Sequence, residues 1–256
     1  MWQTSARVSE WMVDRIDPQP GQVVLELAAG PGDTGLLAAA RVRPGGRLIT
    51  TDLSPRMVEA ALRRAAELGL EEAVEGRVMD AQRIELEDAS VDAVLCRWGV
   101  MLLDDPAAGM REIVRVLRPG GAAAIAVWAE AYRNPWAFVL SQPLARHGLI
   151  DLPGGPGPGP FRLGDRGLLA EMARAAGFER AAVEELELTW AYPSFDEFWR
   201  VTTSVSPSSG RAVREMDDEL RETVRDEAGE RLERFRAGDG YEVPGVVYAL
   251  AARAPR

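Results

Sequence analysis

A glycine-rich turn directly follows an apolar run near the start of the chain, and acidic residues accompany it. The segment VVLELAAGPGDTG spans residues 23–35, with Glu26 in the apolar run and Asp33 inside the turn. Glycines let the backbone approach a ligand closely, and a helix that begins after the turn offers unpaired N–H groups. A strand, a glycine turn and a helix N-terminus together predict a nucleotide-binding site.

The charges around this turn indicate which nucleotide it binds. Residues 30–35 match G-x-G-x-x-G, the dinucleotide fingerprint. The turn contains no Lys or Arg, and two carboxylates that faced a diphosphate would repel it. They suit a ligand with an ammonium and a sulfonium group, and S-adenosylmethionine is such a ligand. Asp33 is equally well interpreted as the N-cap of the following helix, and both interpretations stay open.

Acidic residues recur at the ends of successive predicted strands. Glu26 belongs to the first strand, Asp52 to the second and Asp80 to the third. The carboxyl ends of parallel strands line one crevice of a doubly wound sheet. Asp52 lies 20 residues after Gly32, the spacing at which an acidic residue binds ribose hydroxyls.

The elements that position these residues alternate between strand and helix patterns. We therefore predict an α/β fold, a Rossmann-like doubly wound, mostly parallel seven-stranded sheet with helical cap and lid insertions. The predicted strands are 22–28, 47–52, 74–79, 91–96, 122–128, 181–190 and 241–252. The predicted helices are 5–17, 33–42, 54–68, 106–117 and 165–176, with a mostly helical stretch at 194–237.

The chain is expected to form one domain, residues 1–256. Its core comprises about 20–129, 163–192 and 241–254, and its cap and lid elements about 1–19, 130–162 and 193–240. The Pro/Gly-rich segment LPGGPGPGPF at 152–161 predicts a loop, and we interpret residues 130–162 as a lid over the ligand cleft rather than a passive linker. Apolar residues between Val213 and Phe235 predict one amphipathic helix with a solvated charged face.

Composition excludes several classes of function. The chain has 256 residues, 46% of them hydrophobic, and a net charge of −10, which disfavours nucleic acid and anionic membrane partners. Cys96 is the single cysteine and His147 the single histidine, so we expect no disulfide and no metal site of the usual N/S type, while a carboxylate-only Mg²⁺ site stays open. The first residues lack an apolar signal region and no stretch is long enough to span a membrane, so we expect a cytoplasmic protein.

Five ordered segments resemble the motifs of class I S-adenosylmethionine-dependent methyltransferases, in the small-molecule branch that includes the quinone-biosynthesis C-methyltransferases. They are VVLELAAGPGDTG, TDLSPRMV, RVMDAQRIEL, DAVLCRWGVMLLDDP and VLRPGG. The resemblance covers residues 5–129 well and the rest in outline. Ala28 stands where this family has its first glycine, and the added methyl group should leave cofactor binding intact.

The resemblance implies a role for each matched residue. The methionine part of the cofactor would lie on Glu26, Ala28, Gly30 and Gly32, with the backbone of Arg97 and Trp98 facing its amine. Asp52 would bind the ribose, Leu53 and Met57 would pack on the adenine, and Asp80 would accept from the adenine amino group beside the Ala81 backbone.

The resemblance also implies methyl transfer by in-line displacement to an acceptor that the sequence does not identify. We expect a small, largely apolar metabolite methylated at oxygen, carbon or nitrogen, in a pocket with Trp11, Met101 and Trp136. For Trp98 and Met101, core packing is an equally good interpretation. His147 is the candidate base if the acceptor must lose a proton. We expect no nucleic acid or membrane partner and leave a homodimer open.

Two other functions share some of these features. An NAD(P)-dependent oxidoreductase would share the turn and Asp52, but it gives no reason for Glu26 and Asp80, and no Tyr-x-x-x-Lys pair is present. A non-catalytic S-adenosylmethionine-binding partner protein is compatible with the whole sequence.

Overall fold

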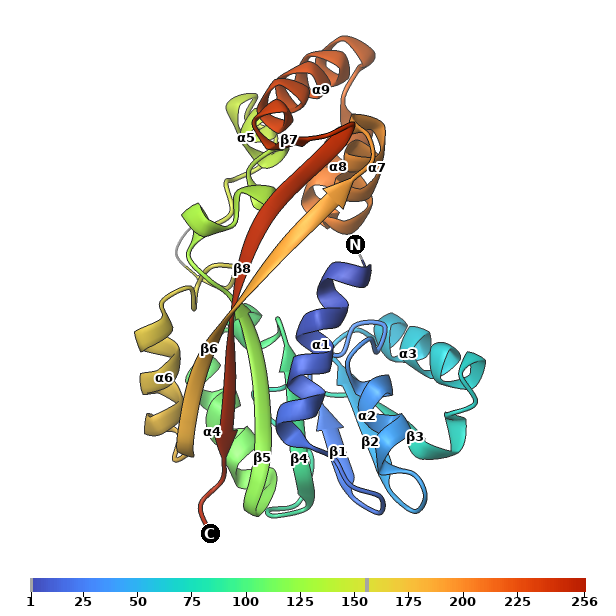
Figure 1. Cartoon of the computed structure of the whole chain (residues 1–256), viewed down its shortest axis with the longest axis vertical. Helices are drawn as coiled ribbons and strands as arrows, with labels where there is room; N and C mark the ends of the chain where they lie inside the picture. Colours follow the sequence, from blue (N-terminus) through green and yellow to red (C-terminus); the bar gives the residue numbers. More distant parts are fainter. Residues whose placement is uncertain (1, 155–156) are drawn as a thin grey trace.

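The computed structural model describes residues 2–154 and 157–256, and its centre is a mostly parallel β-sheet (Figure 1). The strand order is β3-β2-β1-β4-β5-β8-β6, and the short β7 pairs with β8. The strands are β1 Val23–Glu26, β2 Arg47–Asp52, β3 Val74–Val78, β4 Val91–Arg97, β5 Leu117–Trp128, β6 Glu179–Tyr192, β7 Arg236–Ala237 and β8 Gly240–Arg253. The path of seven strands and the α/β class confirm the predicted fold.

The sheet is wound in both directions from its middle. β1 pairs in parallel with β2 on one side and with β4 on the other, whereas β8 is antiparallel to both β5 and β6. The order in which the strands are added to the sheet therefore reverses between β1 and β4. Doubly wound folds bind their ligands at such a point.

Helices cover both faces of the sheet, as right-handed crossovers require. The helices of this part of the chain are α1 Trp2–Ile16, α2 Gly35–Val42, α3 Pro55–Glu67, α4 Pro106–Val116 and α6 Arg166–Ala175. α1 packs beside α2 on one face, and α4 packs beside α6 on the other. Asp105 and Asp165 begin α4 and α6, because each carboxylate accepts a hydrogen bond from the backbone N–H three residues later. The buried alanine run of β5 lets α1 pack closely against the sheet.

A helical cap stands beyond one end of the sheet. β6 and β8 are each 14 residues long and continue past the other strands as a two-stranded ribbon that carries the cap helices (Figure 1). These helices are α7 Phe195–Val205, α8 Pro207–Glu215 and α9 Asp218–Leu232, followed by the 3₁₀ turn η5 Glu233–Phe235. The predicted single amphipathic helix is therefore wrong, because Asp217 caps a new helix and splits the apolar stripe between α8 and α9.

The predicted lid segment contains regular structure in its first half. It holds the 3₁₀ turns η3 Ala131–Arg133 and η4 Pro135–Ala137 and the helix α5 Ser141–Arg146. Asn134 is fully buried; its side-chain N–H groups donate to the carbonyls of Ala129, Glu130 and Val246, and its Oδ1 accepts from the Val246 N–H. This clamp fixes the start of the segment to β8. Within 152–161 the described residues form no helix or strand, and residues 155–156 lie outside the described part.

Among the described residues, no helix combines the length and the apolar character needed to cross a membrane.

Candidate functional site

The predicted site residues meet at one edge of the sheet. Glu26 is the last residue of β1, Asp52 the last of β2 and Arg97 the last of β4, and Asp80 follows the end of β3 by two residues. The parallel register sets Glu26 beside Thr50 and Leu95 of the neighbouring strands. The prediction that Glu26, Asp52 and Asp80 lie at or near the ends of successive strands is therefore confirmed.

Glu26 points into the protein instead of lying open at this edge. Its Oε1 accepts a hydrogen bond from the Gly35 N–H at 2.6 Å and its Oε2 from the Thr50 hydroxyl at 2.9 Å. Burial raises the pKa of Glu26 to about 7, against the opposing effects of these hydrogen bonds and of Arg97. A Cβ at position 35 would lie 2.1 Å from Oε2, so the start of α2 needs glycine there. Glu26 thus holds the turn from beneath.

The glycine turn is joined to β2 through Asp52. One Asp52 oxygen accepts from the Gly30 N–H at 2.9 Å and the other from the Ser54 N–H at 2.9 Å. A carboxylate has about four acceptor positions, and these two hydrogen bonds use two of them. Ala28 adopts φ 50°, in the left-handed region that favours glycine, and Gly32 has φ 83°. The backbone at Ala28 therefore keeps the shape expected of the family's glycine.

The sequence predicted a glycine turn whose negative charge has no basic partner. This prediction is wrong, because two arginines from other elements form ion pairs with Asp33. Asp33 pairs with Arg64 of α3 and with Arg97 of β4, the latter at 3.0 Å. Asp33 is not the N-cap either, since Thr34 holds that position without a side-chain bond. The discrimination against a diphosphate therefore loses its electrostatic basis, and the nature of the ligand depends on other observations.

The sequence argument assigned only the backbone of Arg97 to the site, and its side chain also lies largely buried at this edge. Its side chain is 11% exposed, and its guanidinium lies 4.4 Å from the Trp98 ring centroid. Among the described residues, nothing accepts a hydrogen bond from the buried Nη1. Burial lowers the pKa of Arg97, opposed by Asp33 and Glu26, and an arginine stays charged in such surroundings. The signal in the sequence was a charged residue directly after the buried strand VDAVLC.

Apolar side chains lie open beside Asp52. Leu53 is 72% exposed and Met57 is 43% exposed. Asp80 Oδ1 accepts from the Gln82 N–H at 2.9 Å, and Ala81 is buried directly after it. An exposed apolar surface that follows a carboxylate in the chain suits a flat, partly polar ring.

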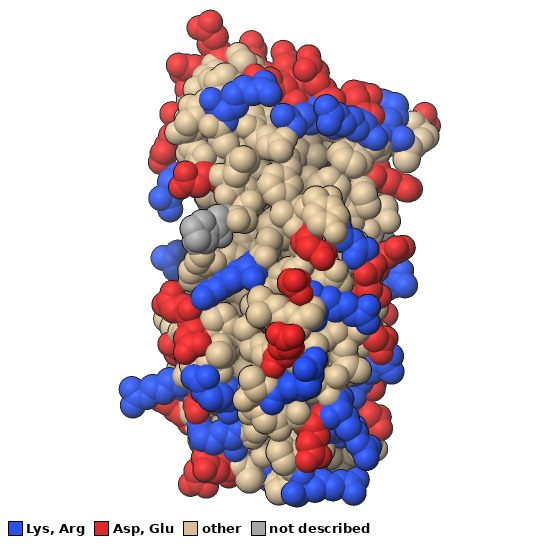
Figure 2. Space-filling model, turned by 90° about the vertical axis from the view of Figure 1, so that its left-hand side faces the viewer, with Lys and Arg blue, Asp and Glu red and all other residues tan. Residues whose placement is uncertain are grey.

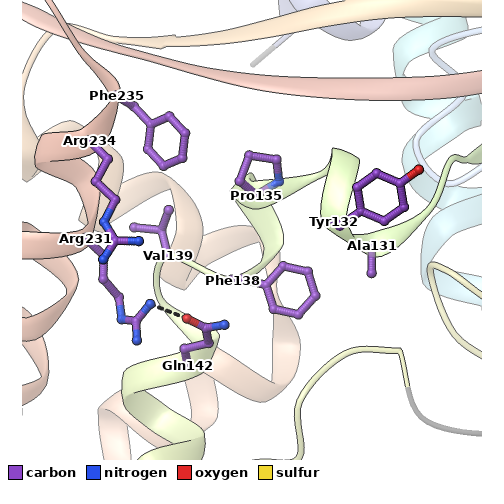
Figure 3. A pocket seen from close by; sticks show the side chains of 9 residues that line it. All are labelled: Ala131, Tyr132, Pro135, Phe138, Val139, Gln142, Arg231, Arg234 and Phe235. Atoms are coloured by element: carbon purple, nitrogen blue, oxygen red, sulfur yellow. Dashed lines mark hydrogen bonds between the residues drawn. The ribbon is translucent and has the colours of Figure 1, made fainter.

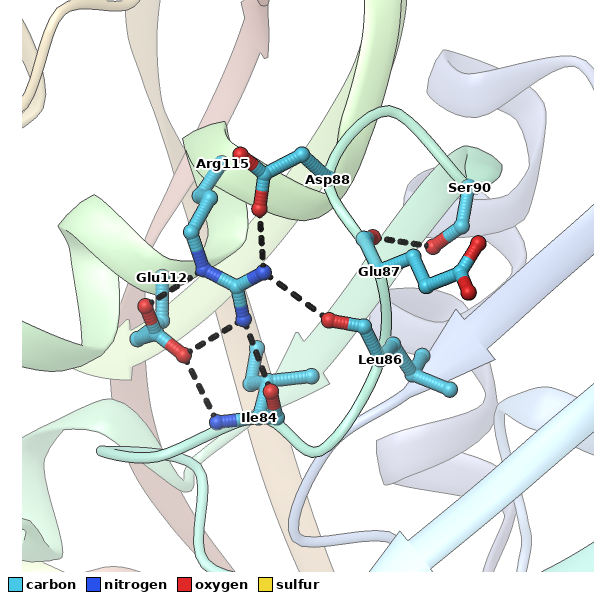
Figure 4. A network of polar contacts seen from close by, with 7 residues as sticks. All are labelled: Ile84, Leu86, Glu87, Asp88, Ser90, Glu112 and Arg115. Atoms are coloured by element: carbon cyan, nitrogen blue, oxygen red, sulfur yellow. Dashed lines mark hydrogen bonds and ion pairs between the residues drawn. The ribbon is translucent and has the colours of Figure 1, made fainter.

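A side-chain network holds the chain that follows β3 (Figure 4). The Arg115 guanidinium of α4 donates to the carbonyls of Ile84 and Leu86 at 2.7 and 2.8 Å and pairs with Asp88 and Glu112. Glu112 in turn accepts from the Ile84 N–H at 2.8 Å, and the hydrogen bond from Arg115 is the main cause of its lowered pKa. The network fixes the connection that begins shortly after Asp80.

A cluster of aromatic rings follows Trp98, which comes directly after β4. Trp98 stacks on Trp128 with 4.5 Å between centroids, and Trp128 contacts Trp136 at 4.7 Å. Met101 is buried at the same end of β4, in the 3₁₀ turn η2 Val100–Leu102. The structure thus brings Trp98 and Trp136 into one aromatic cluster, with Met101 in the core.

Two predicted residues lie elsewhere. The Trp11 indole N–H donates to Glu184 of β6 at 3.1 Å, so this ring fastens α1 to the sheet. His147 ends α5 in the cap, with its Nε2 3.3 Å from a carboxylate oxygen of Glu227 in α9. The contact with Glu184 gives Trp11 a structural role. The role of His147 as a base stays a prediction, and its contact with Glu227 in the cap does not support it.

The part of the chain that contains this sheet edge is similar to known methyltransferases. Residues 25–125 match the family model described as a methyltransferase domain. The ubiquinone/menaquinone biosynthesis C-methyltransferase UbiE of Caulobacter vibrioides is 36% identical over 115 residues, which are 42% of this chain and 44% of that protein. The chain matches between 31% and 47% of the length of the curated relatives considered.

Solved structures share the fold over nearly the whole chain. A Bacillus halodurans C-125 protein aligns with a TM-score of 0.67 at 18% identity, covering 97% of this chain and 99% of that one. A geranyl diphosphate methyltransferase in complex with S-adenosylmethionine aligns with a TM-score of 0.56 at 21% identity, covering 97% and 84%. An NAD(P)-dependent oxidoreductase finds no support in these comparisons. Residues 25–125 therefore resemble a methyltransferase domain, and the chain as a whole shares the fold of these solved structures.

Proposed function

We propose that this chain transfers a methyl group from S-adenosylmethionine to a small, largely apolar metabolite by in-line displacement. The observation that carries the proposal is the buried Nη1 of Arg97, a cationic donor without an acceptor among the described residues. A buried unpaired donor costs roughly 1–3 kcal/mol, so a ligand carboxylate there would stabilise the protein. S-adenosylmethionine carries such a carboxylate on its methionine part.

The other residues of the edge fit the rest of this cofactor. The free acceptor positions of Asp52 would bind the ribose hydroxyls, and the exposed side chains of Leu53 and Met57 would pack on the adenine. Asp80, beside Ala81, would accept from the adenine amino group. The backbone of Ala28, Gly30 and Gly32 would lie against the methionine part, with Glu26 supporting the turn from below.

The chemistry needs alignment more than proton transfer. When bound, the cofactor supplies a methyl group on a sulfonium, which needs no further activation. The protein has to hold the acceptor atom roughly 3–3.5 Å from that methyl and to exclude water. Trp98 and Trp136 would form the wall on the acceptor side. A base is needed only if the acceptor must lose a proton.

The aromatic wall favours a ring or an apolar chain as acceptor. The relative from Caulobacter vibrioides is a C-methyltransferase of ubiquinone/menaquinone biosynthesis, so quinone-like rings are the first acceptors to test, together with phenols and amines. The net charge of −10 disfavours a polyanionic substrate.

The role of Arg97 can be tested with decarboxylated S-adenosylmethionine. Wild-type protein should bind the intact cofactor about ten- to a hundredfold more tightly than the decarboxylated one, since a hydrogen bond between charged groups contributes roughly 1.5–3 kcal/mol. Arg97→Met should lose this preference, whereas Arg63→Met, an exposed arginine on α3, should keep it. Equal binding of both molecules by the wild type, or an unchanged preference in Arg97→Met, would refute the assignment.

Activity is measured as release of the demethylated cofactor with a panel of quinones, phenols and amines. We expect turnover with at least one member of the panel. Efficient methylation of tRNA or a protein, with none on the panel, would contradict the small-molecule proposal.

A further inference from the structure

A cavity lies in the cap, away from the candidate site at the sheet edge. It has a volume of about 400 Å³ and lies between residues 131–142 and residues 231–235 (Figure 3). These two segments are distant in sequence, and α5 and α9 pack against each other beside the cavity. None of the residues that line it belongs to the candidate cofactor site.

One side of the cavity is apolar. Pro135 and Phe138 line it opposite Phe235, and the exposed ring of Tyr132 stands beside them (Figure 3). The Phe138 ring stacks on Phe161 with 5.8 Å between centroids and 14° between planes, which fixes its position. Such a wall accommodates an aliphatic chain or a ring.

The other side carries two arginines without a carboxylate partner. Arg231 donates to the neutral amide oxygen of Gln142 (Figure 3), and Arg234 makes no hydrogen bond or ion pair in the described part of the chain. Two arginines near them in the cap do have carboxylate partners, since Arg225 pairs with Asp196 and Arg236 with Glu233.

Charge also sets this area apart on the molecular surface. The chain has 40 acidic and 30 basic residues, so two unpaired cations beside one apolar cavity depart from its overall balance. Figure 2 faces the side on which α5 lies in Figure 1, and in its upper part Arg side chains stand, among Asp and Glu side chains, above a largely uncharged area. Positive charge next to an apolar surface recognises a molecule that is anionic at one end and apolar along its body.

We propose that this cap cavity is a binding site for an amphipathic organic anion, with Arg231 and Arg234 binding its carboxylate or phosphate and the wall around Phe138 its apolar body. The site is separate from the proposed cofactor site and does not depend on methyl transfer. A ring contact path, Phe138–Phe161–Trp136–Trp128–Trp98, leads from this cavity to Arg97 at the sheet edge.

Calorimetry without cofactor tests the site with octanoate and octyl phosphate against octan-1-ol, which has the same chain and no charge. We expect saturable binding of at least one anion, about tenfold tighter than that of octan-1-ol. Arg234→Gln and Arg231→Gln should each weaken the anion by about five- to tenfold, and 0.5 M salt should weaken it further. Arg174→Gln, an exposed arginine on α6 outside the cavity, should change nothing.

A blocking variant guards against a folding defect in the arginine variants. Ala131 lines the cavity and is partly exposed, so Ala131→Phe should fill it without disturbing the core, and should abolish binding of anion and alcohol alike. The proposal is overturned if neither anion binds more tightly than octan-1-ol, or if binding survives both Arg234→Gln and Ala131→Phe. Anion binding by a protein that does not bind S-adenosylmethionine would refute the proposed function and leave this site standing.

Discussion

Replacing Glu26 with glutamine should make the protein less sensitive to rising pH. Glu26 is buried beneath the start of α2, and its pKa lies near 7, raised from 4.5 chiefly by burial. Because the folded pKa lies above the unfolded one, the stabilisation is fully present below about pH 4.5 and is lost as the pH rises through about 7. Glutamine keeps the shape of the protonated side chain and does not titrate.

The magnitude follows from the two pKa values. Between pH 5.5 and 8.5 the free energy of unfolding of the wild type should fall by about 2 kcal/mol relative to Glu26→Gln. The assay is urea denaturation of both proteins at several pH values, and the difference between them removes the other titrating groups. Glu59→Gln, at an exposed position on α3, should give a flat difference over the same range.

A difference that does not change with pH would refute the account of Glu26, since the carboxyl would then be ionised in both states or open to water. A marked loss of cofactor affinity in Glu26→Gln at pH 6, with stability unchanged, would show that Glu26 contacts the ligand directly instead of holding the turn.

Three further variants test the site and its support. Asp52→Asn should weaken S-adenosylmethionine binding about ten- to a hundredfold in calorimetry, while Asp226→Asn on the exposed face of α9 should leave it unchanged. If Asp52→Asn and the wild type had the same dissociation constant, Asp52 would have a structural role only. His147→Ala should keep turnover within about twofold, because its partner is in the cap, and a loss of about 10²–10⁴ would restore it as the base. Arg115→Ala should lower the free energy of unfolding by about 2 kcal/mol, more than Arg83→Ala does, and equal values would show that the network in Figure 4 contributes little.

The fold could be predicted because its signals are local. Apolar runs such as that before Glu26 mark buried strands, and Pro55 or Asp105 marks the start of a helix. The strand-end acids Glu26, Asp52 and Asp80 lie at one edge because parallel strands must align their carboxyl ends.

What the sequence could not provide are contacts between distant segments. Asp33 and Arg97 are 64 residues apart, so the neutral character of the turn was invisible in a window around the glycines. The buried orientation of Glu26 likewise depends on Thr50 of the neighbouring strand. Asn134 illustrates the same limit, because its clamp on Val246 joins positions 112 residues apart and makes the first half of the expected lid part of the folded body.

Calorimetry with S-adenosylmethionine, its demethylated product and NAD tests the central claim most directly. We predict saturable, one-site binding of S-adenosylmethionine and of the product, with dissociation constants on the order of 1 μM, and no heat of binding for NAD. Saturable binding of NAD, with no response to S-adenosylmethionine or its product, would contradict the account of this site.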